Sequence, residues 1–280
     1  MQFIDLAKQQ SLIKTNLDKR IQDVLAHGKY IMGPEIKEME AQLAEYVGVK
    51  HCVSCSSGTD ALLMPLLAWD VGPGDAVFTT PFTFIATAEV IQLLGATPIF
   101  VDIDPKTYNI SPELLDDAIT EVIEKGELNP KVIIPVDLFG LPADYAAIEL
   151  ISKKYDIKIL EDAAQGFGGQ IDDRLAGSFG DAASTSFFPA KPLGCYGDGG
   201  AIFTDDDELY EKLVSVRVHG KGGDKYDNVR IGLNGRMDTL QAAIVLEKFT
   251  LFPTEVKLRN KVADQYNALL SDRVVVPEVS

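Results

Sequence analysis

The sequence is poor in cysteine, histidine and tryptophan, and it lacks any long hydrophobic run. Its 280 residues include 3 cysteines, 3 histidines and 1 tryptophan. No apolar segment approaches the roughly 18 residues of a membrane-spanning helix. The opening MQFIDLAKQQ has neither the basic start nor the apolar core of a signal peptide. We therefore expect a cytoplasmic protein that has no membrane partner.

Basic residues are also scarce relative to acidic ones. The chain carries 26 Lys and Arg against 42 Asp and Glu, a formal net charge of −16, and no basic run of the kind that follows a phosphate backbone. Nucleic acid is therefore not an expected partner. With 46% hydrophobic and 24% charged residues, the composition is that of a globular protein. The length fits one large domain and part of another.

The three cysteines do not form a recognisable metal or disulfide pattern. Cys52 and Cys55 have CxxC spacing, but no second CxxC accompanies them, and Cys195 is alone. Side chains three residues apart on a strand point to opposite faces. We interpret all three as buried or inert thiols and expect no metal site.

Short β-branched runs alternate with helical patterns along the chain. Strands are predicted at 51–55, 76–80, 97–102, 131–137, 157–162, 183–188 and 200–205. Helices are predicted near 59–69, 83–93, 111–125, 144–155 and 206–217. Apolar strands separated by crossover helices indicate an α/β fold: a mostly parallel, seven-stranded sheet with helices on both faces.

Both ends of the chain show helical patterns. The first 48 residues are mainly helical, with PEIKEMEAQLAEYVG placing apolar residues at helical spacing. A second long helical region runs from about Arg236 toward Leu270. The final VVVPEVS resembles a strand that enters a further domain, so we expect a second domain to be truncated or absent here.

Two loops after predicted strands are candidates for binding a phosphate and a flat ring. SSGTDAL (56–62) opens a helix with small side chains, hydroxyls and backbone N–H groups at a positive helix end. The same residues are also those of an ordinary capped turn. In TPFTFIATAE (80–89), Phe84 follows a strand end, where its ring either stacks on a ligand or joins the core.

Two further loops supply a carboxylate and an amine. In ILEDAAQ (159–165), alternation sends Glu161 and Asp162 to opposite sides of the sheet. Asp162 either caps the following residues or pairs with a protonated ring nitrogen, because an ionised carboxylate there needs a cationic partner. In SFFPAKPLGCYGDGG, Lys191 lies in a Pro- and Gly-rich loop between two strands. Desolvation lowers the pKa of an ammonium, so Lys191 is a candidate Schiff-base nucleophile.

The carboxyl ends of strands in an open parallel sheet gather around one crevice. A phosphate cradle, a stacking ring, an acid for a pyridinium and an amine for an aldehyde are together the attachment points that pyridoxal phosphate needs. The sequence therefore predicts a pyridoxal-phosphate enzyme.

The chain resembles the DegT/DnrJ/EryC1/StrS group of pyridoxal-phosphate-dependent nucleotide-sugar aminotransferases over essentially all its length. The matching segments include GKYIMGPEIKEMEAQLAEYVG, SSGTDAL, TPFTFIATAE, VDIDPKTYNI, EDAAQGFG, TSFFPAKPLGCYGDGG, VRVHG and GLNGRMDTLQAAI. The resemblance implies an aspartate-aminotransferase type fold (fold type I). It also implies a cofactor-binding large domain at 1–250 and the start of a small C-terminal domain at 251–280.

The family pattern assigns roles to eight residues. Lys191 becomes the Schiff-base lysine and Asp162 the partner of the pyridine nitrogen. Gln165 would lie beside the phenolic oxygen of the ring, and Phe84 would cover its face. Thr59, Asp60 and Ser186 would hold the phosphate, and Asn234 would reach the phosphate of the neighbouring subunit. The resemblance thus implies a homodimer with shared active sites.

The substrate is inferred from the same resemblance. The sequence is most similar to enzymes that aminate a UDP-linked 3-keto sugar acid (2-acetamido-2-deoxy-3-oxo-glucuronate) for surface polysaccharides such as lipopolysaccharide O-antigen, usually with glutamate as donor. Family members normally continue into a C-terminal domain that shapes the sugar pocket, and this chain ends near its beginning.

Four alternatives remain at this point. A 4-keto sugar nucleotide is a second substrate class. A pyridoxal-phosphate sugar dehydratase would carry histidine where Lys191 stands, and a noncatalytic relative would not be expected to keep Lys191, Asp162 and Gln165. A nicotinamide-binding domain would need G-x-G-x-x-G after the first strand, and SSGTDAL lacks that spacing.

Overall fold

The computed structural model describes residues 4–224, 226–276 and 278. The helices are α1 (Leu6–His27), α2 (Pro34–Val47), α3 (Gly58–Ala68), α4 (Ala86–Leu93), α5 (Pro112–Lys125), the 3-10 turn η1 (Leu138–Gly140), α6 (Tyr145–Tyr155), α7 (Asp207–Val216), α8 (Thr239–Phe249) and α9 (Phe252–Leu270). The strands are β1 (His51–Cys55), β2 (Asp75–Thr79), β3 (Thr97–Phe100), β4 (Asn129–Ile134), β5 (Lys158–Asp162), β6 (Gln170–Ile171), β7 (Arg174–Leu175), β8 (Ala182–Ser186) and β9 (Gly200–Thr204).

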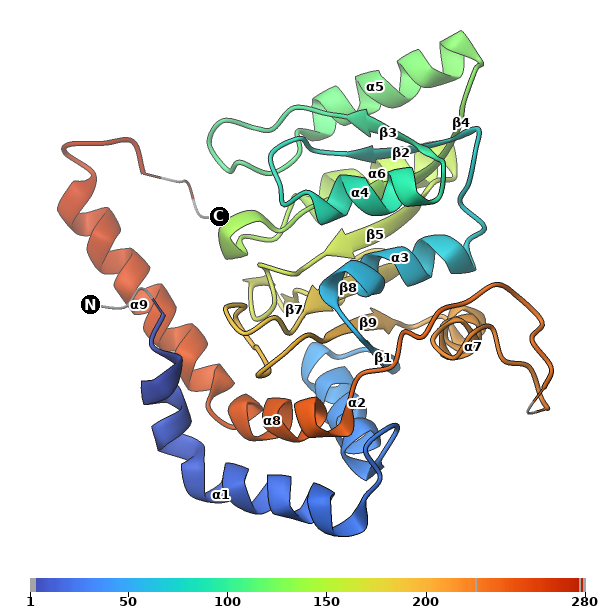
Figure 1. The fold of residues 1–280 in the computed structure, drawn as a ribbon. Helices are drawn as coiled ribbons and strands as arrows, with labels where there is room; N and C mark the ends of the chain where they lie inside the picture. Colours follow the sequence, from blue (N-terminus) through green and yellow to red (C-terminus); the bar gives the residue numbers. More distant parts are fainter. Residues whose placement is uncertain (1–3, 225, 277, 279–280) are drawn as a thin grey trace.

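Seven strands form one sheet in the order β1-β9-β8-β5-β4-β2-β3 (Figure 1). The pairs from β8 to β3 are all parallel, whereas β9 runs antiparallel to both β1 and β8. The predicted mostly parallel, seven-stranded sheet is therefore confirmed. Because the parallel strands share one direction, the loops after β5 and β8 emerge at the same edge.

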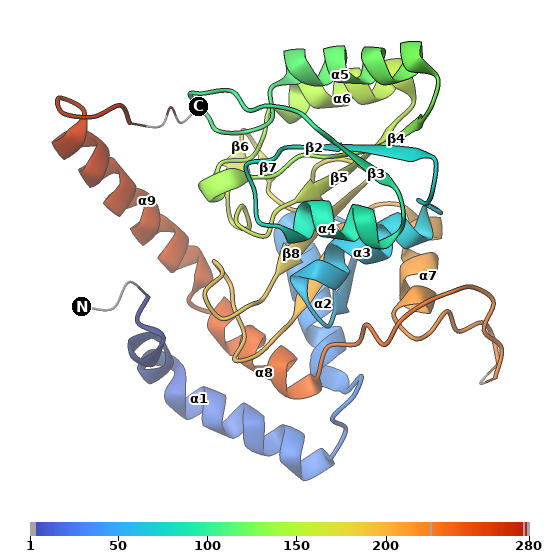
Figure 2. The same cartoon turned by 45° about the horizontal axis from the view of Figure 1, so that its top comes forward.

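Helices cover both faces of the sheet (Figure 2). One face packs against α3, α4 and α7 through a buried cluster that includes Cys55, Val77 and Leu160. The other face packs against α2 and α8 at the β1 end and against α5 and α6 at the β3 end. Cys52 belongs to the cluster opposite that of Cys55, as alternation predicts.

The helices begin and end where local chemistry favours it. Ser57, Ser111 and Asp144 each accept a hydrogen bond from a backbone N–H in the first turn of α3, α5 and α6. Helices α1, α2 and α5 end at glycines with left-handed backbone conformations, where a side chain would be strained.

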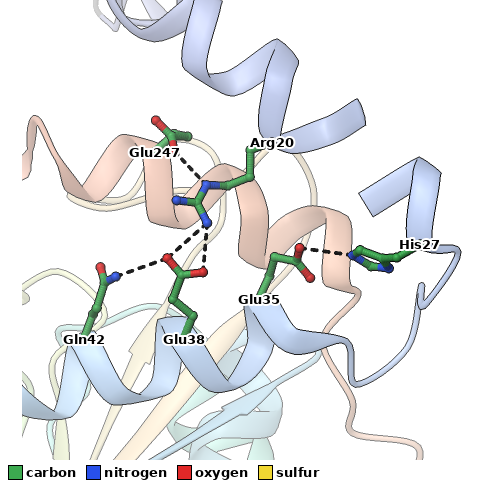
Figure 3. A network of polar contacts seen from close by, with 6 residues as sticks. All are labelled: Arg20, His27, Glu35, Glu38, Gln42 and Glu247. Carbon is green, nitrogen blue, oxygen red and sulfur yellow. Dashed lines mark hydrogen bonds and ion pairs between the residues drawn. The ribbon is translucent and has the colours of Figure 1, made fainter. Parts of the chain in front are cut away.

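A polar network joins α1 to the rest of the molecule (Figure 3). Arg20 Nε lies 2.7 Å from Glu247 Oε1 of α8, and its Nη1 lies 2.9 Å from Glu38 Oε2 of α2. His27 contacts the buried Glu35 at 3.1 Å. These contacts attach the long N-terminal helix to the helical layer beside β1.

The C-terminal region differs from its prediction in two respects. The predicted helical region divides into α8, which is largely buried, and α9, of which only Phe252 is buried. Figures 1 and 2 both show α9 running away from the sheet. Residues 274–276 form no strand, so the strand predicted in VVVPEVS is wrong for those residues; 277, 279 and 280 lie outside the described residues.

Candidate functional site

A cavity of about 1320 Å³ opens at the edge where β5 and β8 end. It exceeds the roughly 300–1,000 Å³ of typical ligand pockets, so it has room for more than one bound group. Six of the eight site residues predicted from the sequence line it: Thr59, Phe84, Asp162, Gln165, Ser186 and Lys191. The structure therefore brings together segments that are more than a hundred residues apart in the sequence.

Asp162 places a buried carboxylate in this wall. It is the last residue of β5 and is 5% exposed. Its Oδ2 accepts a hydrogen bond from Thr87 Oγ1 at 2.9 Å, and its Oδ1 accepts one from Ala164 N at 3.2 Å. Burial raises the pKa of Asp162, while these two donors and the nearby Lys191 oppose that shift. The contact with Ala164 shows that Asp162 also caps the following turn.

Lys191 supplies the amine. Its loop is closed at the base by hydrogen bonds from Cys195 N to Phe187 O (2.7 Å) and from Phe187 N to Gly199 O (2.8 Å). Burial lowers the pKa of the Lys191 ammonium, and the charge of Asp162 partly offsets this effect. A partly desolvated amine beside a buried carboxylate is suited to attack a carbonyl carbon.

The first turn of α3 forms the third part of the wall. Ser57 caps the helix by accepting a hydrogen bond from Asp60 N at 3.1 Å. Ser186, at the end of β8, packs directly on Gly58, where an added Cβ would lie 2.5 Å from Ser186 Cβ. Only glycine fits this close approach. The helix end therefore presents backbone N–H groups and hydroxyls to the cavity, which is the chemistry of an anion site.

Two further predicted residues lie in the wall. Phe84 is 66% exposed, so the interpretation of its ring as a core residue is wrong. Gln165 accepts a hydrogen bond from Phe139 N through its Oε1 at 3.2 Å. Phe139, with a φ of 57°, is itself exposed and also lines the cavity.

Asp60 and Asn234 do not line the cavity of their own chain. The carboxylate of Asp60 accepts a hydrogen bond from Ser56 Oγ, and its backbone N–H donates to Ser57 Oγ. Asn234 is exposed, and its Oδ1 accepts a hydrogen bond from Arg236 Nε at 2.9 Å.

All three cysteines are buried free thiols, in agreement with the prediction. Within the described ranges, no group of three or more His, Cys, Asp or Glu side chains is arranged to hold a metal ion. In the same residues, no helix is long and apolar enough to cross a bilayer.

Several residues of the site were missed by the sequence analysis. Thr87 orients the carboxylate of Asp162 through a hydrogen bond. Thr87 lies four residues after Thr83, with which it shares a hydrogen bond of 3.0 Å, and this spacing could have pointed to Thr87 from the sequence. Lys248 of α8 lines the cavity although it is buried. Its helical pattern gave no sign that the cavity lies on that side.

A pair of buried acidic residues, Asp137 and Glu161, lies behind Asp162. Asp137 and Glu161 are both fully buried, and their carboxyl groups influence each other's pKa. Asp137 Oδ1 accepts from Tyr145 Oη at 2.8 Å, and Glu161 accepts from Gly177 N and Phe179 N. Burial raises the pKa of Asp137 to about 7 and that of Glu161 in the same direction. Glu161 thus faces away from Asp162, as predicted.

The fold and this wall define an α/β protein with a partly buried lysine and a buried carboxylate at the carboxyl edge of its sheet. Residues 11–279 match the model of the DegT/DnrJ/EryC1/StrS aminotransferase family. The chain belongs to that family, and it is an aminotransferase of fold type I.

Individual relatives are similar over most of the chain. A UDP-2-acetamido-2-deoxy-3-oxo-D-glucuronate aminotransferase of Pseudomonas aeruginosa is 52% identical over 270 residues, which are 96% of this chain and 73% of the relative. A crystal structure of a DegT DnrJ EryC1 StrS aminotransferase from Brucella abortus is 54% identical, with a TM-score of 0.99 over 100% of this chain and 75% of that one. The structure of NtdA from Bacillus subtilis with bound cofactor PMP is 33% identical, with a TM-score of 0.89; the match covers 100% of this chain and 64% of that one.

Proposed function

We propose that this protein is a pyridoxal-phosphate-dependent aminotransferase that transfers an amino group from an amino acid, with glutamate as the expected donor, to a keto group of a nucleotide-linked sugar. The observation that carries the proposal is the half-buried amine of Lys191 beside the buried carboxylate of Asp162 in one cavity. Membership of an aminotransferase family and the PMP bound by the NtdA structure support it, because PMP is the aminated form of the same cofactor.

The residues present fit this cofactor. When bound, it supplies an aldehyde carbon and a ring that draws electrons from the reacting carbon. Lys191 would hold the aldehyde and carry protons at its Nζ, and its lowered pKa favours the neutral amine. Asp162 would hold the protonated ring nitrogen, with Thr87 and Ala164 N fixing the orientation of its carboxylate.

Other residues would fix the position of the ring and the phosphate. Phe84 would cover the ring face, and Gln165 would lie beside its phenolic oxygen. Ser186 and the first turn of α3, with Thr59 and Asp60, would hold the phosphate. The close fit of Ser186 against Gly58 supports this, because it leaves the helix N-terminus bare of larger side chains.

The substrate proposed is the C3 keto group of a UDP-linked 3-keto-N-acetylglucosaminuronate, for surface polysaccharide such as O-antigen. The Pseudomonas aeruginosa relative, whose name specifies a 3-oxo sugar, supports C3 over C4. Lysine at position 191 argues against the dehydratase alternative. Three buried free thiols are typical of a reducing compartment and support a cytoplasmic location.

Colour and covalent trapping test the cofactor, and a substrate panel tests the reaction. The purified protein should absorb in the visible or near-ultraviolet, and borohydride should fix the cofactor to the peptide that contains Lys191. With glutamate, amination should be fastest for the UDP-linked 3-keto sugar acid in a panel of keto-sugar nucleotides. A colourless protein that gains no mass with added pyridoxal phosphate would overturn the proposed cofactor-dependent activity. A preference for a 4-keto sugar nucleotide would overturn the proposed C3 keto substrate.

We further propose that the domain boundary lies near residue 250, with 1–250 as the cofactor-binding domain and 251–280 as the start of a small C-terminal domain. The change from buried α8 to exposed α9 supports this boundary. The active unit would be a homodimer in which Asn234 reaches the phosphate of the neighbouring site. The exposure of Asn234 and its absence from the cavity wall of its own chain support this arrangement.

Mixed dimers test the shared site. Lys191→Ala chains and Asn234→Ala chains should each be defective alone. In a mixed dimer both lesions fall on one site and leave the other intact, so activity should recover above either parent. If activity does not recover despite verified subunit exchange, Asn234 does not act across the dimer.

A further inference from the structure

Lys248 is a buried lysine without an anionic partner. It lies on α8 and is 2% exposed. Its Nζ lies 5.3 Å from the centre of the Tyr196 ring, and within the described ranges no carboxylate comes within 4.0 Å of it. The adjacent Glu247 is paired with Arg20 of α1. The acid next to Lys248 in the sequence is therefore engaged elsewhere.

Burying an unpaired ammonium is unfavourable, because the charge loses its hydration. Burial accordingly lowers the pKa of Lys248, and the charge of Glu255 is the main opposing influence. Both carboxylate oxygens of Glu255 already accept from Gln9 Nε2, at 2.8 and 2.9 Å. Among the described residues, the ammonium of Lys248 therefore contacts the Tyr196 ring but has no carboxylate partner.

Lys248 belongs to the wall of the same cavity as Lys191, and so does Arg259 of α9. Arg259 lies close enough to Lys248 to lower its pKa. Four acidic residues also line the cavity: Asp5, Asp162, Asp198 and Glu255. Asp162 is engaged by Thr87, Asp5 caps α1 and Glu255 contacts Gln9, so none of these three pairs with Lys248 or Arg259. Asp198 is exposed.

We propose that Lys248, assisted by Arg259, forms an anion subsite that binds an oxyanion of the nucleotide-sugar substrate. This inference rests on the proposed function, which places a nucleotide sugar in the cavity. Such a substrate offers two oxyanions, the sugar carboxylate and the diphosphate. A charge-assisted hydrogen bond to either one would supply the partner that Lys248 lacks.

Unreactive analogues can test this subsite by binding alone. The probes are UDP, UDP-N-acetylglucosamine and UDP-N-acetylglucosaminuronate, titrated calorimetrically into the cofactor-loaded protein. Lys248→Met removes the charge and keeps the aliphatic stem, Lys248→Arg keeps the charge, and Lys261→Met changes an exposed lysine of α9 as the control.

Lys248→Met should bind the sugar acid about tenfold more weakly or worse, and Lys248→Arg should recover part of the loss. If only the affinity for the sugar acid falls, the sugar carboxylate is the oxyanion that Lys248 binds. If the affinity for all three probes falls equally, the diphosphate is that oxyanion. If Lys248→Met does not fold, Arg259→Gln at its exposed position should weaken the same probes. An unchanged affinity of Lys248→Met for all three probes overturns the subsite. If wild-type protein binds none of the probes, the proposed nucleotide-sugar function itself fails.

Discussion

The cavity has two walls that are built in opposite ways. The sheet wall consists of residues at strand ends and in the loops after them, such as Asp162 and Ser186, which are 5% and 8% exposed. The helical wall consists of the start of α1 and the outer face of α9, where Leu258, Val262 and Tyr266 are 56%, 49% and 62% exposed.

Hydrogen bonds hold the polar groups of the sheet wall in place, whereas in the helical wall the polar contact between Gln9 of α1 and Glu255 of α9 lies beside exposed apolar side chains. Asp162 accepts two bonds from the protein, and Ser186 Oγ accepts one from Phe188 N. Leu258 and Val262 have aliphatic side chains, which hydrogen bonds cannot hold in place. A reactive group needs a fixed position and a controlled pKa, which only a packed, hydrogen-bonded wall provides. The sheet wall therefore suits chemistry, whereas the helical wall suits recognition of a variable part of the substrate.

The strongest test of the sheet wall is Lys191→Ala. We expect turnover to fall at least about a thousandfold, because the variant would lose the amine that we propose attacks the carbonyl and carries protons. The cofactor should still bind, but denaturation should release it unreduced after borohydride treatment. Lys261→Ala is the matched control and should behave as wild type. Turnover close to wild type in pure Lys191→Ala would remove Lys191 from the mechanism.

Asp162→Asn should have the next largest effect. An amide cannot stabilise a protonated ring nitrogen, so we expect about a hundredfold lower turnover, equivalent to about 2.7 kcal/mol of transition-state stabilisation. The fold should survive, because the amide oxygen can still accept from Thr87. Turnover and circular dichroism should be measured on the same preparation. Unchanged turnover would place the ring-nitrogen partner elsewhere.

Behind the sheet wall, the Asp137–Glu161 pair should make stability depend on pH. In the unfolded chain Asp137 titrates near 3.8, and in the folded protein burial raises its pKa to about 7. Between these values the folded state holds a proton that the unfolded state lacks, so the free energy of unfolding falls as pH rises through this window.

Asp137→Asn should reduce this fall by roughly 2 kcal/mol, because the amide replaces the protonated carboxyl without titrating. Urea unfolding at several pH values from 4 to 8 measures the effect. Asp117→Asn, at an exposed position on α5, is the control. A pH profile for Asp137→Asn that parallels the wild type would show that the pair does not share a proton.

The sequence predicted the sheet wall far better than the helical wall. Alternation correctly sent Glu161 and Asp162 to different sides, and all seven predicted strands of the sheet exist, within two or three residues at most ends. The hairpin β6–β7 was missed because two-residue strands carry no periodic pattern. Lys248 was missed because its burial is a matter of tertiary packing: α8 packs against α1 and α2, and the Nζ of Lys248 lies over the Tyr196 ring, all of which are distant in sequence. Local patterns report periodicity, and they do not report which face a distant element will cover.

The smallest effect is expected at Leu258 in the helical wall. Because its side chain is more than half exposed, Leu258→Ala should change the free energy of unfolding of the 280-residue chain by less than about 0.5 kcal/mol. Alanine also favours the helix, so α9 should persist. Urea unfolding gives the stability, and the visible absorption of the bound cofactor reports on the sheet wall, which should not change. A loss of about 2 kcal/mol or more, the cost of truncating a buried leucine, would mean that α9 packs as firmly as the sheet wall, and the division between a chemical and a recognition wall would not hold.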